Sequence, residues 1–564
     1  MIHSDRDSLR AWFRSGELWI WANAAAVGIS IIAIVGILIL LAARGFSHFW
    51  PADIQLMTYR DDGDRTAVAL GEIADSETLS VQQFVESVGG SGRAVPEGLD
   101  EVERLLVKTG NRRYDPPDFT WIFTHKIDAV SFPDDATVFE RMEWGNAYGY
   151  LRAVGGPQET VSDPALLWDT FGNLMERAAG LRASIEDIER GVLNEINFGM
   201  EKVRLERRSI ELGGLDVDQA ATAMQELDER DLDLEKRYES AEQELRSLYR
   251  ELQRDYVRVE LATGQVIEMR LAEIVRAWRP NQMSALDKLW HYLESFSLFL
   301  SEQPREANTE GGIFPAIFGT VLMVLLMSVL VTPFGVIAAV YLREYARQGA
   351  FVRLIRIAVN NLAGVPSIVY GVFGLGFFVY FLGGNLDQLF FPEALPAPTF
   401  GTPGLMWASL TLALLTVPVV VVSTEEGLTR IPRAIREGSL ALGATKAETL
   451  FKVVLPMASP SILTGVILAV ARAAGEVAPL MLVGVVKLAP TLPLDGNFPY
   501  LHLERKFMHL GFHIYDVGFQ SPNVEAARPL VYATALLLVL IIIILNLAAI
   551  MLRSRLEDRY RGVE

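Results

Sequence analysis

Residues 437–445 read Glu-Gly-Ser-Leu-Ala-Leu-Gly-Ala-Thr, and the same stretch ends at Val453-Val454-Leu455-Pro456. It is polar and helix-competent, and it lies between two apolar segments that are each long enough to cross a bilayer. Gly443 interrupts the helical pattern where a tight turn fits, and Pro456 stands near the start of the next apolar segment. We expect two short helices that meet at the glycine and form a knob at a membrane surface. The alternative is an ordinary loop between helices.

Composition places the chain among membrane proteins with a large acidic part. The 564 residues are 51% hydrophobic and the formal net charge is −18. Residues 45–310 carry roughly −22 of that charge, so the remainder is slightly basic. An acidic block argues against binding of nucleic acid, which needs a basic surface.

Three kinds of chemistry are disfavoured by what the sequence lacks. It has no cysteine, which excludes disulfides, thiolate metal sites and cysteine nucleophiles. His509 and His513 have the spacing of two ligands on one helix face, but the Glu of a zinc-protease motif is missing, so we expect no metal site. No phosphate-binding Gly-x-x-x-x-Gly-Lys-Ser/Thr run occurs, so we expect no cofactor in this chain.

Apolar runs predict six transmembrane helices, at residues 19–43, 314–342, 357–382, 405–422, 462–485 and 530–552. The alternative for the first run is a cleaved signal peptide, but the run is longer than the apolar core of such peptides. Arginines precede it within residues 1–18, which places this N-terminal segment in the cytoplasm.

The positive-inside rule gives a consistent topology. Basic clusters lie between the second and third runs, between the fourth and fifth, and in the tail 553–564. All of them fall on the cytoplasmic side if the N-terminus does. Residues 45–310 then lie on the far face, which in a bacterial inner membrane is the periplasm.

Residues 45–310 are expected to form an α+β insert. Apolar residues step by four and three from Phe171 to Val192 and again from Leu227 to Leu252, on either side of Gly213-Gly214. This spacing predicts a long antiparallel coiled-coil hairpin over residues 164–255. Strand-like flanks at 51–160 and 256–275, with a β-hairpin around Thr263-Gly264, predict one small β domain into which the hairpin is inserted.

Arg472 and Glu476 are candidates for a transport path because both fall within the fifth apolar run. A charged side chain inside a membrane is costly unless it faces water or a partner. Their i, i+4 spacing puts them on one helix face. Arg472 could offer a fixed charge to an oxyanion, since its fork matches phosphate. The alternative is a structural ion pair.

The third run carries further polar candidates. Pro366 between two glycines should break the helix and expose backbone groups, which membranes tolerate where a cavity is lined. Asn361, Ser367 and Tyr370 could form hydrogen bonds with a permeating anion, or equally hold neighbouring helices together.

Three motifs in order resemble one family. The stretch at 437–456 is similar to the cytoplasmic coupling loop of ABC-importer permeases, with Glu437, Gly443, Leu455 and Pro456 on the family spacing; Gly438, Ser439 and Val453 depart from it. Ala363–Gly371 and Arg472–Leu480 resemble segments of the phosphate-specific permeases, nearer the PstA type than the PstC type. The resemblance covers residue 313 onward, and the long insert departs from compact family members.

This resemblance implies an all-α polytopic membrane protein with the ABC importer type I permease fold and a large periplasmic insert. Residues 313–552 would form a core of five transmembrane helices with a coupling loop at 424–458. The residues expected to contact the ATPase are Glu437, Gly443, Ala444, Thr445, Leu455 and Pro456.

The implied function is a phosphate importer permease that is not itself an enzyme. Its partners would be a second permease of the PstC type, a PstB-type ATPase dimer that binds ATP and Mg²⁺, and a PstS-type periplasmic phosphate-binding protein. The alternatives are a permease for sulfate or molybdate, or a periplasmic sensor with two spans around an external coiled coil.

Overall fold

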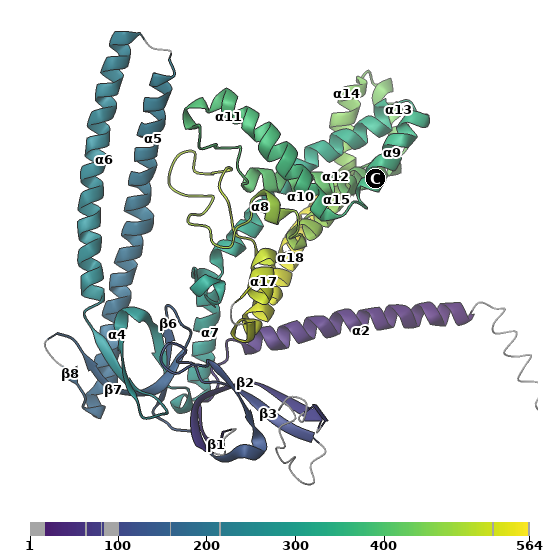
Figure 1. Ribbon diagram of the computed structural model, residues 1–564. Coiled ribbons are helices and arrows are strands. Elements are labelled where there is room, and N and C mark those ends of the chain that lie inside the picture. The colour runs from purple at the N-terminus through teal and green to yellow at the C-terminus, as the bar shows by residue number, and fades with distance from the viewer. Residues whose placement is uncertain are drawn as a thin grey trace, which may run out of the picture.

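The computed structural model describes residues 17–61, 65–80, 82–83, 101–157, 160–213, 216–521 and 524–561. Figure 1 shows two parts: a β-rich part from which a long helical hairpin rises, and a bundle of apolar helices. The N-terminal segment 1–18, expected in the cytoplasm, lies almost wholly outside the described residues.

The first sheet is antiparallel and comes entirely from the chain before the hairpin. Its strand order is β4-β3-β2-β1-β5. The strands are β1 (Gln55–Arg60), β2 (Thr66–Ser80), β3 (Glu101–Lys108), β4 (Phe119–Phe123) and β5 (Ile127–Ser131). A 3-10 turn, η1 (Thr124–Lys126), separates β4 from β5.

The second sheet joins chain from both sides of the hairpin, in the order β10-β9-β7-β6-β11, with β8 paired to β7. Its strands are β6 (Ala136–Arg141), β7 (Ala147–Gly155), β8 (Thr160–Val161), β9 (Tyr256–Glu260), β10 (Val266–Arg270) and β11 (Ile274–Trp278); the short helices η3 (Leu271–Glu273) and η4 (Pro280–Gln282) adjoin β11. Strands β9 and β10 pair around Thr263-Gly264 as predicted, with Gly264 at φ +81°. The flanks form two sheets, and Ile54 and Leu70 on the side of the first share a buried cluster with Val138 and Tyr148 of the second, so one small β domain built from both flanks stays a prediction.

The helical hairpin consists of α4 (Pro164–Asp187), the π-helical turn η2 (Ile188–Val192), α5 (Leu193–Glu211) and α6 (Val217–Leu252). Asp163 and Asp216 cap α4 and α6 by accepting hydrogen bonds from backbone N–H groups. Arms α5 and α6 lie side by side (Figure 1). The coiled-coil assignment itself stays a prediction.

The predicted heptad residues face inward with two exceptions. Phe171, Ala178 and Ile185 are buried at intervals of seven, whereas Val192 and Tyr238 are 39% and 37% exposed. Beyond η2 the buried positions continue at Ile196 and Val203. The step from Ile188 to Ile196 is eight because a π turn adds one residue to the helix.

In the described residues, six helices are long and apolar enough to cross a membrane: Trp19–Ser47, Phe314–Tyr345, Ser367–Phe390, Leu405–Arg430, Lys446–Gly475 and Ala527–Asp558. The first and last of these spans lie within α2 (Glu17–Ser47) and α18 (Val524–Arg561). The other four are formed by α8 (Phe314–Val340) with η6 (Tyr341–Tyr345), α10 (Ser367–Phe373) with η7 (Gly374–Gly383) and α11 (Gly384–Phe390), α12 (Leu405–Arg430), and α14 (Lys446–Thr449) with η9 (Leu450–Val454) and α15 (Leu455–Gly475). The remaining helices are α7 (Ala285–Ser301), η5 (Glu306–Asn308), α9 (Ala350–Leu362), η8 (Pro392–Ala394), α13 (Arg433–Ala441), α16 (Leu480–Val483) and α17 (Leu510–Phe519).

The number of spans agrees with the sequence prediction, but the third, fourth and fifth candidate spans have different bounds. The third candidate span begins at Ser367, after Pro366, and residues 357–362 belong to the separate helix α9. The fifth begins earlier than predicted and ends at Gly475, so residues 476–485 lie beyond it. The predicted tail 553–564 continues α18 as far as Arg561.

A strained turn connects the insert to the helix bundle. Glu306, Ala307 and Asn308 have φ values of +39°, +55° and +74°, and the short pair β12 (Pro304–Arg305) and β13 (Glu310–Gly311) closes the turn. Left-handed backbone costs about 1–2 kcal/mol for each such residue other than glycine. Contacts on both sides must therefore hold it.

Side chains of this turn contact both the insert and the helix bundle. The carboxylate of Glu306 binds Arg112 and accepts a 2.9 Å hydrogen bond from the backbone N–H of Gly145, both in the insert. The Asn308 amide donates to the backbone oxygen of Lys487 at 2.9 Å and to Asp516 Oδ2 at 3.3 Å. Glu306 therefore binds the insert, and Asn308, two residues later, binds the helix bundle.

Candidate coupling knob and transport path

The knob expected at 437–445 is formed by α13 and α14, with Gly443 between them at φ +90°. Only glycine adopts this backbone freely, which explains the residue type at the turn. Thr445 then caps α14: its hydroxyl accepts from the N–H of Glu448, whose carboxylate accepts from the N–H of Thr445. We call α13, the Gly443 turn and α14 the coupling knob.

The coupling knob is held rigidly against the end of α8. Arg436 pairs with Glu344 at 3.1 Å and donates to the backbone oxygen of Leu428 at 2.6 Å. Lys446 binds the backbone oxygen of Glu344 and lies 4.5 Å from the ring centre of Tyr345. Beneath these contacts an apolar cluster is buried, with Val340, Leu428, Ile431, Leu450, Val454 and Ala458.

The predicted coupling residues divide between the surface and the helix below it. Glu437, Gly443 and Thr445 are exposed, whereas Ala444, Leu455 and Pro456 are partly buried. The predicted loop 424–458 is shorter than expected, because residues 424–430 complete α12 and residues 450–458 continue into α15. Whether these residues contact an ATPase stays a prediction.

Two apolar side chains of this region were not singled out from the sequence. Leu442 is 91% exposed beside Gly443, and Phe451 in η9 is 69% exposed. Leu442 lies on the anchored coupling knob together with the exposed Leu440, and Phe451 lies next to the knob. An apolar residue within a charged stretch is the signal that could have found them.

Arg472 and Glu476 form a loose ion pair, with Nε and Oε1 3.6 Å apart. The expectation of one continuous helix face is wrong, because α15 ends at Gly475 and Glu476 has extended backbone. Their side chains are 33% and 20% exposed. The Arg472 guanidinium is therefore accessible from outside the chain.

The polar candidates around Pro366 differ in burial and in their contacts. Tyr370 is buried and donates to the backbone oxygen of Leu362 at 2.6 Å, which spans the break before α10. It is close enough to Arg472 for an electrostatic effect. Ser367 is partly buried and Asn361 is exposed. Tyr370 thus supports the helix break.

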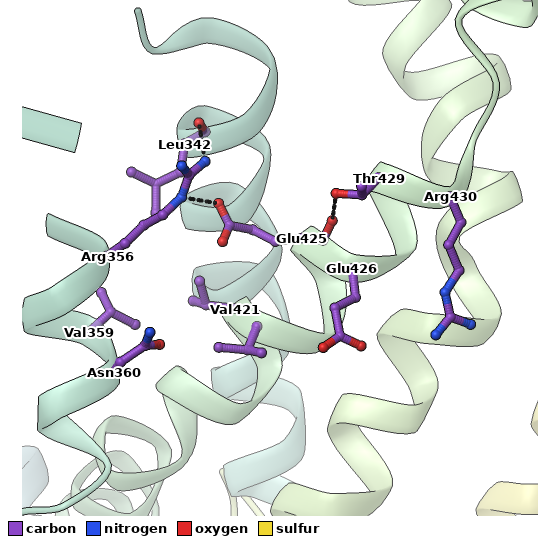
Figure 2. Close-up of a pocket in the computed structure, with 10 residues that line it drawn as sticks. Leu342, Arg356, Val359, Asn360, Val421, Glu425, Glu426, Thr429 and Arg430 are labelled. Carbon is purple, nitrogen blue, oxygen red and sulfur yellow. Dashed lines mark hydrogen bonds and ion pairs between the residues drawn. The ribbon is translucent and has the colours of Figure 1, made fainter. Parts of the chain in front are cut away.

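A cavity of about 410 Å³ lies between α9 and α12 near the coupling knob. Figure 2 shows Arg356 of α9 directed at Glu425 of α12, with Glu426 and Arg430 on the far side. The Arg356 Nε to Glu425 Oε1 distance is 3.2 Å. The cavity therefore has charged groups of both signs at the C-terminal end of α12.

His509 and His513, whose spacing suggested a ligand pair, are both buried. Burial lowers the pKa of each to about 4. His509 Nδ1 accepts the backbone N–H of Gly511, so it caps α17. Across the described ranges, no group of three or more His, Asp or Glu residues is arranged to hold a metal ion.

Part of this chain is similar in sequence to known transport proteins. Residues 331–562 match the family "Binding-protein-dependent transport system inner membrane component". The phosphate transport system permease protein PstA 1 of Mycobacterium tuberculosis H37Rv is 36% identical over 255 residues, covering 44% of this chain and 72% of that protein. The PstA protein of Mycobacterium leprae is 39% identical over 194 residues, covering 34% of this chain and 58% of that protein. Among solved structures, the inward-facing MetNI methionine ABC transporter aligns at 18% identity over 43% of this chain and 94% of that chain, with a TM-score of 0.31.

The apolar helices and the anchored knob between two of them are those of a multi-pass membrane transport permease. The chain belongs to the family of binding-protein-dependent transport system inner membrane components. This confirms the resemblance read from the sequence. Membership implies an ATPase and a substrate-binding protein as partners, and the permease subunit is not itself an enzyme.

Proposed function

We propose that this chain is the PstA-type permease subunit of an ATP-driven phosphate importer. Its partners would be a PstC-type permease, a PstB-type ATPase dimer and a PstS-type phosphate-binding protein. Relatives named for phosphate transport support phosphate over sulfate or molybdate. Basic residues beside the coupling knob support a cytoplasmic knob in an inner membrane, with the insert in the periplasm and both termini in the cytoplasm.

The coupling knob is the observation that carries this proposal. An anchored surface that exposes Leu440 and Leu442, with Phe451 beside it, suits docking of a soluble protein, since exposed apolar groups on an anchored surface gain most from being covered. The knob is continuous with α15, which carries Arg472 at its other end. Movement of a docked ATPase would therefore reach the transport path along one helix.

Arg472 would provide a positive charge for the phosphate group. Its ion pair with Glu476 is long at 3.6 Å, so an incoming oxyanion can compete for the guanidinium. The planar fork of arginine binds phosphate through two parallel hydrogen bonds, which lysine cannot reproduce. Glu476 would then return to Arg472 after release.

Phosphate uptake in a strain that lacks its own permease gene tests the proposal. The wild-type gene should restore uptake, whereas Arg472→Gln and the double variant Arg472→Gln, Glu476→Gln should each lose at least about tenfold at normal membrane levels. Arg472→Lys should retain part of the activity. The matched control is Arg353→Gln, an exposed arginine of α9, which should transport normally.

Two results would contradict the proposal in different ways. Normal uptake by the double variant would make Arg472 and Glu476 a structural ion pair, since that change leaves no unpaired charge. Restoration of sulfate or molybdate uptake instead of phosphate uptake by the wild-type gene would refute the assigned substrate.

A further inference from the structure

A cavity of about 440 Å³ separates the insert from the helix bundle. It is lined by the end of α2, the start of α18, the helix α7 and strands β2, β3 and β11. Figure 1 shows α2 meeting the foot of the bundle above β2 and β3, at the opposite end from α13 and α14. The cavity therefore lies where two candidate membrane spans leave the apolar region.

Glu72 and Glu140, two of the carboxylates that line the cavity beside Asp75, Glu302 and Glu310, have close basic partners. Glu140 pairs with both Arg276 and Arg305, and Glu72 lies 3.6 Å from Lys108. Arg305 still has two buried nitrogens, Nε and Nη1, without a hydrogen-bond acceptor. Buried charged donors that lack an acceptor are costly, so a ligand that brought acceptor atoms to these nitrogens would be favoured.

At the entrance of this cavity, the positive charges of two arginines are neutralised little or not at all by acidic side chains. Arg44 of α2 is exposed and forms no ion pair within the described part of the chain. Arg528 of α18 is 55% exposed, and its Asp75 partner is 3.9 Å away. Both line the same cavity as the aromatic rings of Trp50 and Tyr532.

The positions of these arginines on their helices indicate which class of ligand they could bind. Gly45 packs against Tyr532 and Leu536 of α18, so Arg44 and Arg528 belong to touching helices. Basic and aromatic side chains at the end of a membrane span lie at the depth of lipid headgroups, where phosphate is the abundant anion. Arginine forks suit phosphate better than they suit a single carboxylate.

We infer that Arg44 and Arg528 form a phosphate-group site at the entrance of this cavity, occupied by a phospholipid headgroup whose acyl chains lie along α2 and α18. Phosphate oxygens would accept from both guanidinium groups. The site would tie the insert to the membrane edge of the bundle. This inference does not depend on which substrate the transporter carries.

The test is the melting temperature of the full chain purified in a nonionic detergent. Three probes are titrated: dioctanoyl phosphatidylglycerol, dioctanoylglycerol, which has the same chains without phosphate, and inorganic phosphate. The phospholipid should raise the melting temperature, and the neutral lipid should not. For the double variant Arg44→Gln, Arg528→Gln, the phospholipid concentration that gives half of the maximal shift should rise at least about tenfold. The reason is the loss of two charge-assisted contacts.

Two further variants keep the result interpretable. Arg353→Gln removes an exposed arginine elsewhere on the surface and should respond like wild type. The double variant Arg44→Lys, Arg528→Lys keeps both charges, and should show an intermediate response even if the glutamine variant does not fold.

Each outcome decides for or against the site. A shift produced by inorganic phosphate and lost in the glutamine variant supports the same site with free phosphate as its ligand. Equal shifts from both lipids, a phospholipid shift that survives both double variants, or no shift with either phosphate-bearing probe would overturn the inference.

Discussion

At the strained turn Glu306–Asn308, the hydrogen bonds of Asn308 stabilise the fold and its left-handed backbone destabilises it. Substitution of Asn308 can separate these two contributions. Asn308→Ala removes the two amide hydrogen bonds, at 2.9 and 3.3 Å, which are each worth about 1 kcal/mol. It also puts alanine at φ +74°, which adds about 1 kcal/mol relative to asparagine. The expected loss of unfolding free energy is therefore about 3 kcal/mol.

Asn308→Gly provides the comparison, because glycine accepts positive φ without strain. It loses the hydrogen bonds alone, so its destabilisation should be about 2 kcal/mol. The difference of about 1 kcal/mol between the two variants measures the backbone strain.

Denaturant unfolding of the detergent-purified protein, followed by fluorescence, measures these values. Exposed Asn361 is the control, and Asn361→Ala should change stability by less than about 0.5 kcal/mol. Equal loss in Asn308→Ala and Asn308→Gly would show that strain has no part in the turn. Wild-type stability in both would refute the view that Asn308 fastens the insert to the bundle.

Two further predictions follow from single residues. Burial raises the pKa of Glu310 to about 7; because the folded chain then holds this proton more tightly than the unfolded chain, stability should fall by about 3 kcal/mol as pH rises from about 4.5 to about 7. Glu310→Gln should remove most of that fall in melting curves recorded across this range, and an unchanged pH profile would contradict it. Gly443→Asp should leave the permease in the membrane but reduce uptake per ATP hydrolysed, since Gly443 has φ +90° and open space around it, so that only the turn is strained. Gly438→Ala, also in open space but without positive φ, should couple normally, and equal behaviour of the two variants would refute the role of the turn.

Features set by local chemistry could be predicted from the sequence. Gly443 and Gly264 occupy turns because both backbones have positive φ, which a glycine in a polar stretch signals. The six spans follow from composition, since a run of about 20 apolar residues has few other uses.

Features set by distant contacts could not be predicted. Glu306 and Asn308 hold a left-handed turn only because Arg112 and Asp516, each nearly 200 or more residues away, bind their side chains. The exposure of Leu442 and Phe451 depends on how the coupling knob packs on α8. The end of α15 at Gly475 was missed because the apolar pattern continues beyond it.

The helical hairpin touches the bundle partway along its length. α5 packs against η8, and Phe198 meets the ring of His502 with centroids 6.1 Å apart. The adjacent Gly199 faces Leu234, which is midway along α6. If the base of the hairpin stays fixed on the second sheet, its arms form a lever with this contact at half length. A displacement of the His502 loop would then be about doubled at the tip, roughly 54 Å from the base at 1.5 Å per residue. The tip is consequently the place for a distance label, because it would report movements of the bundle that are too small to resolve where they occur.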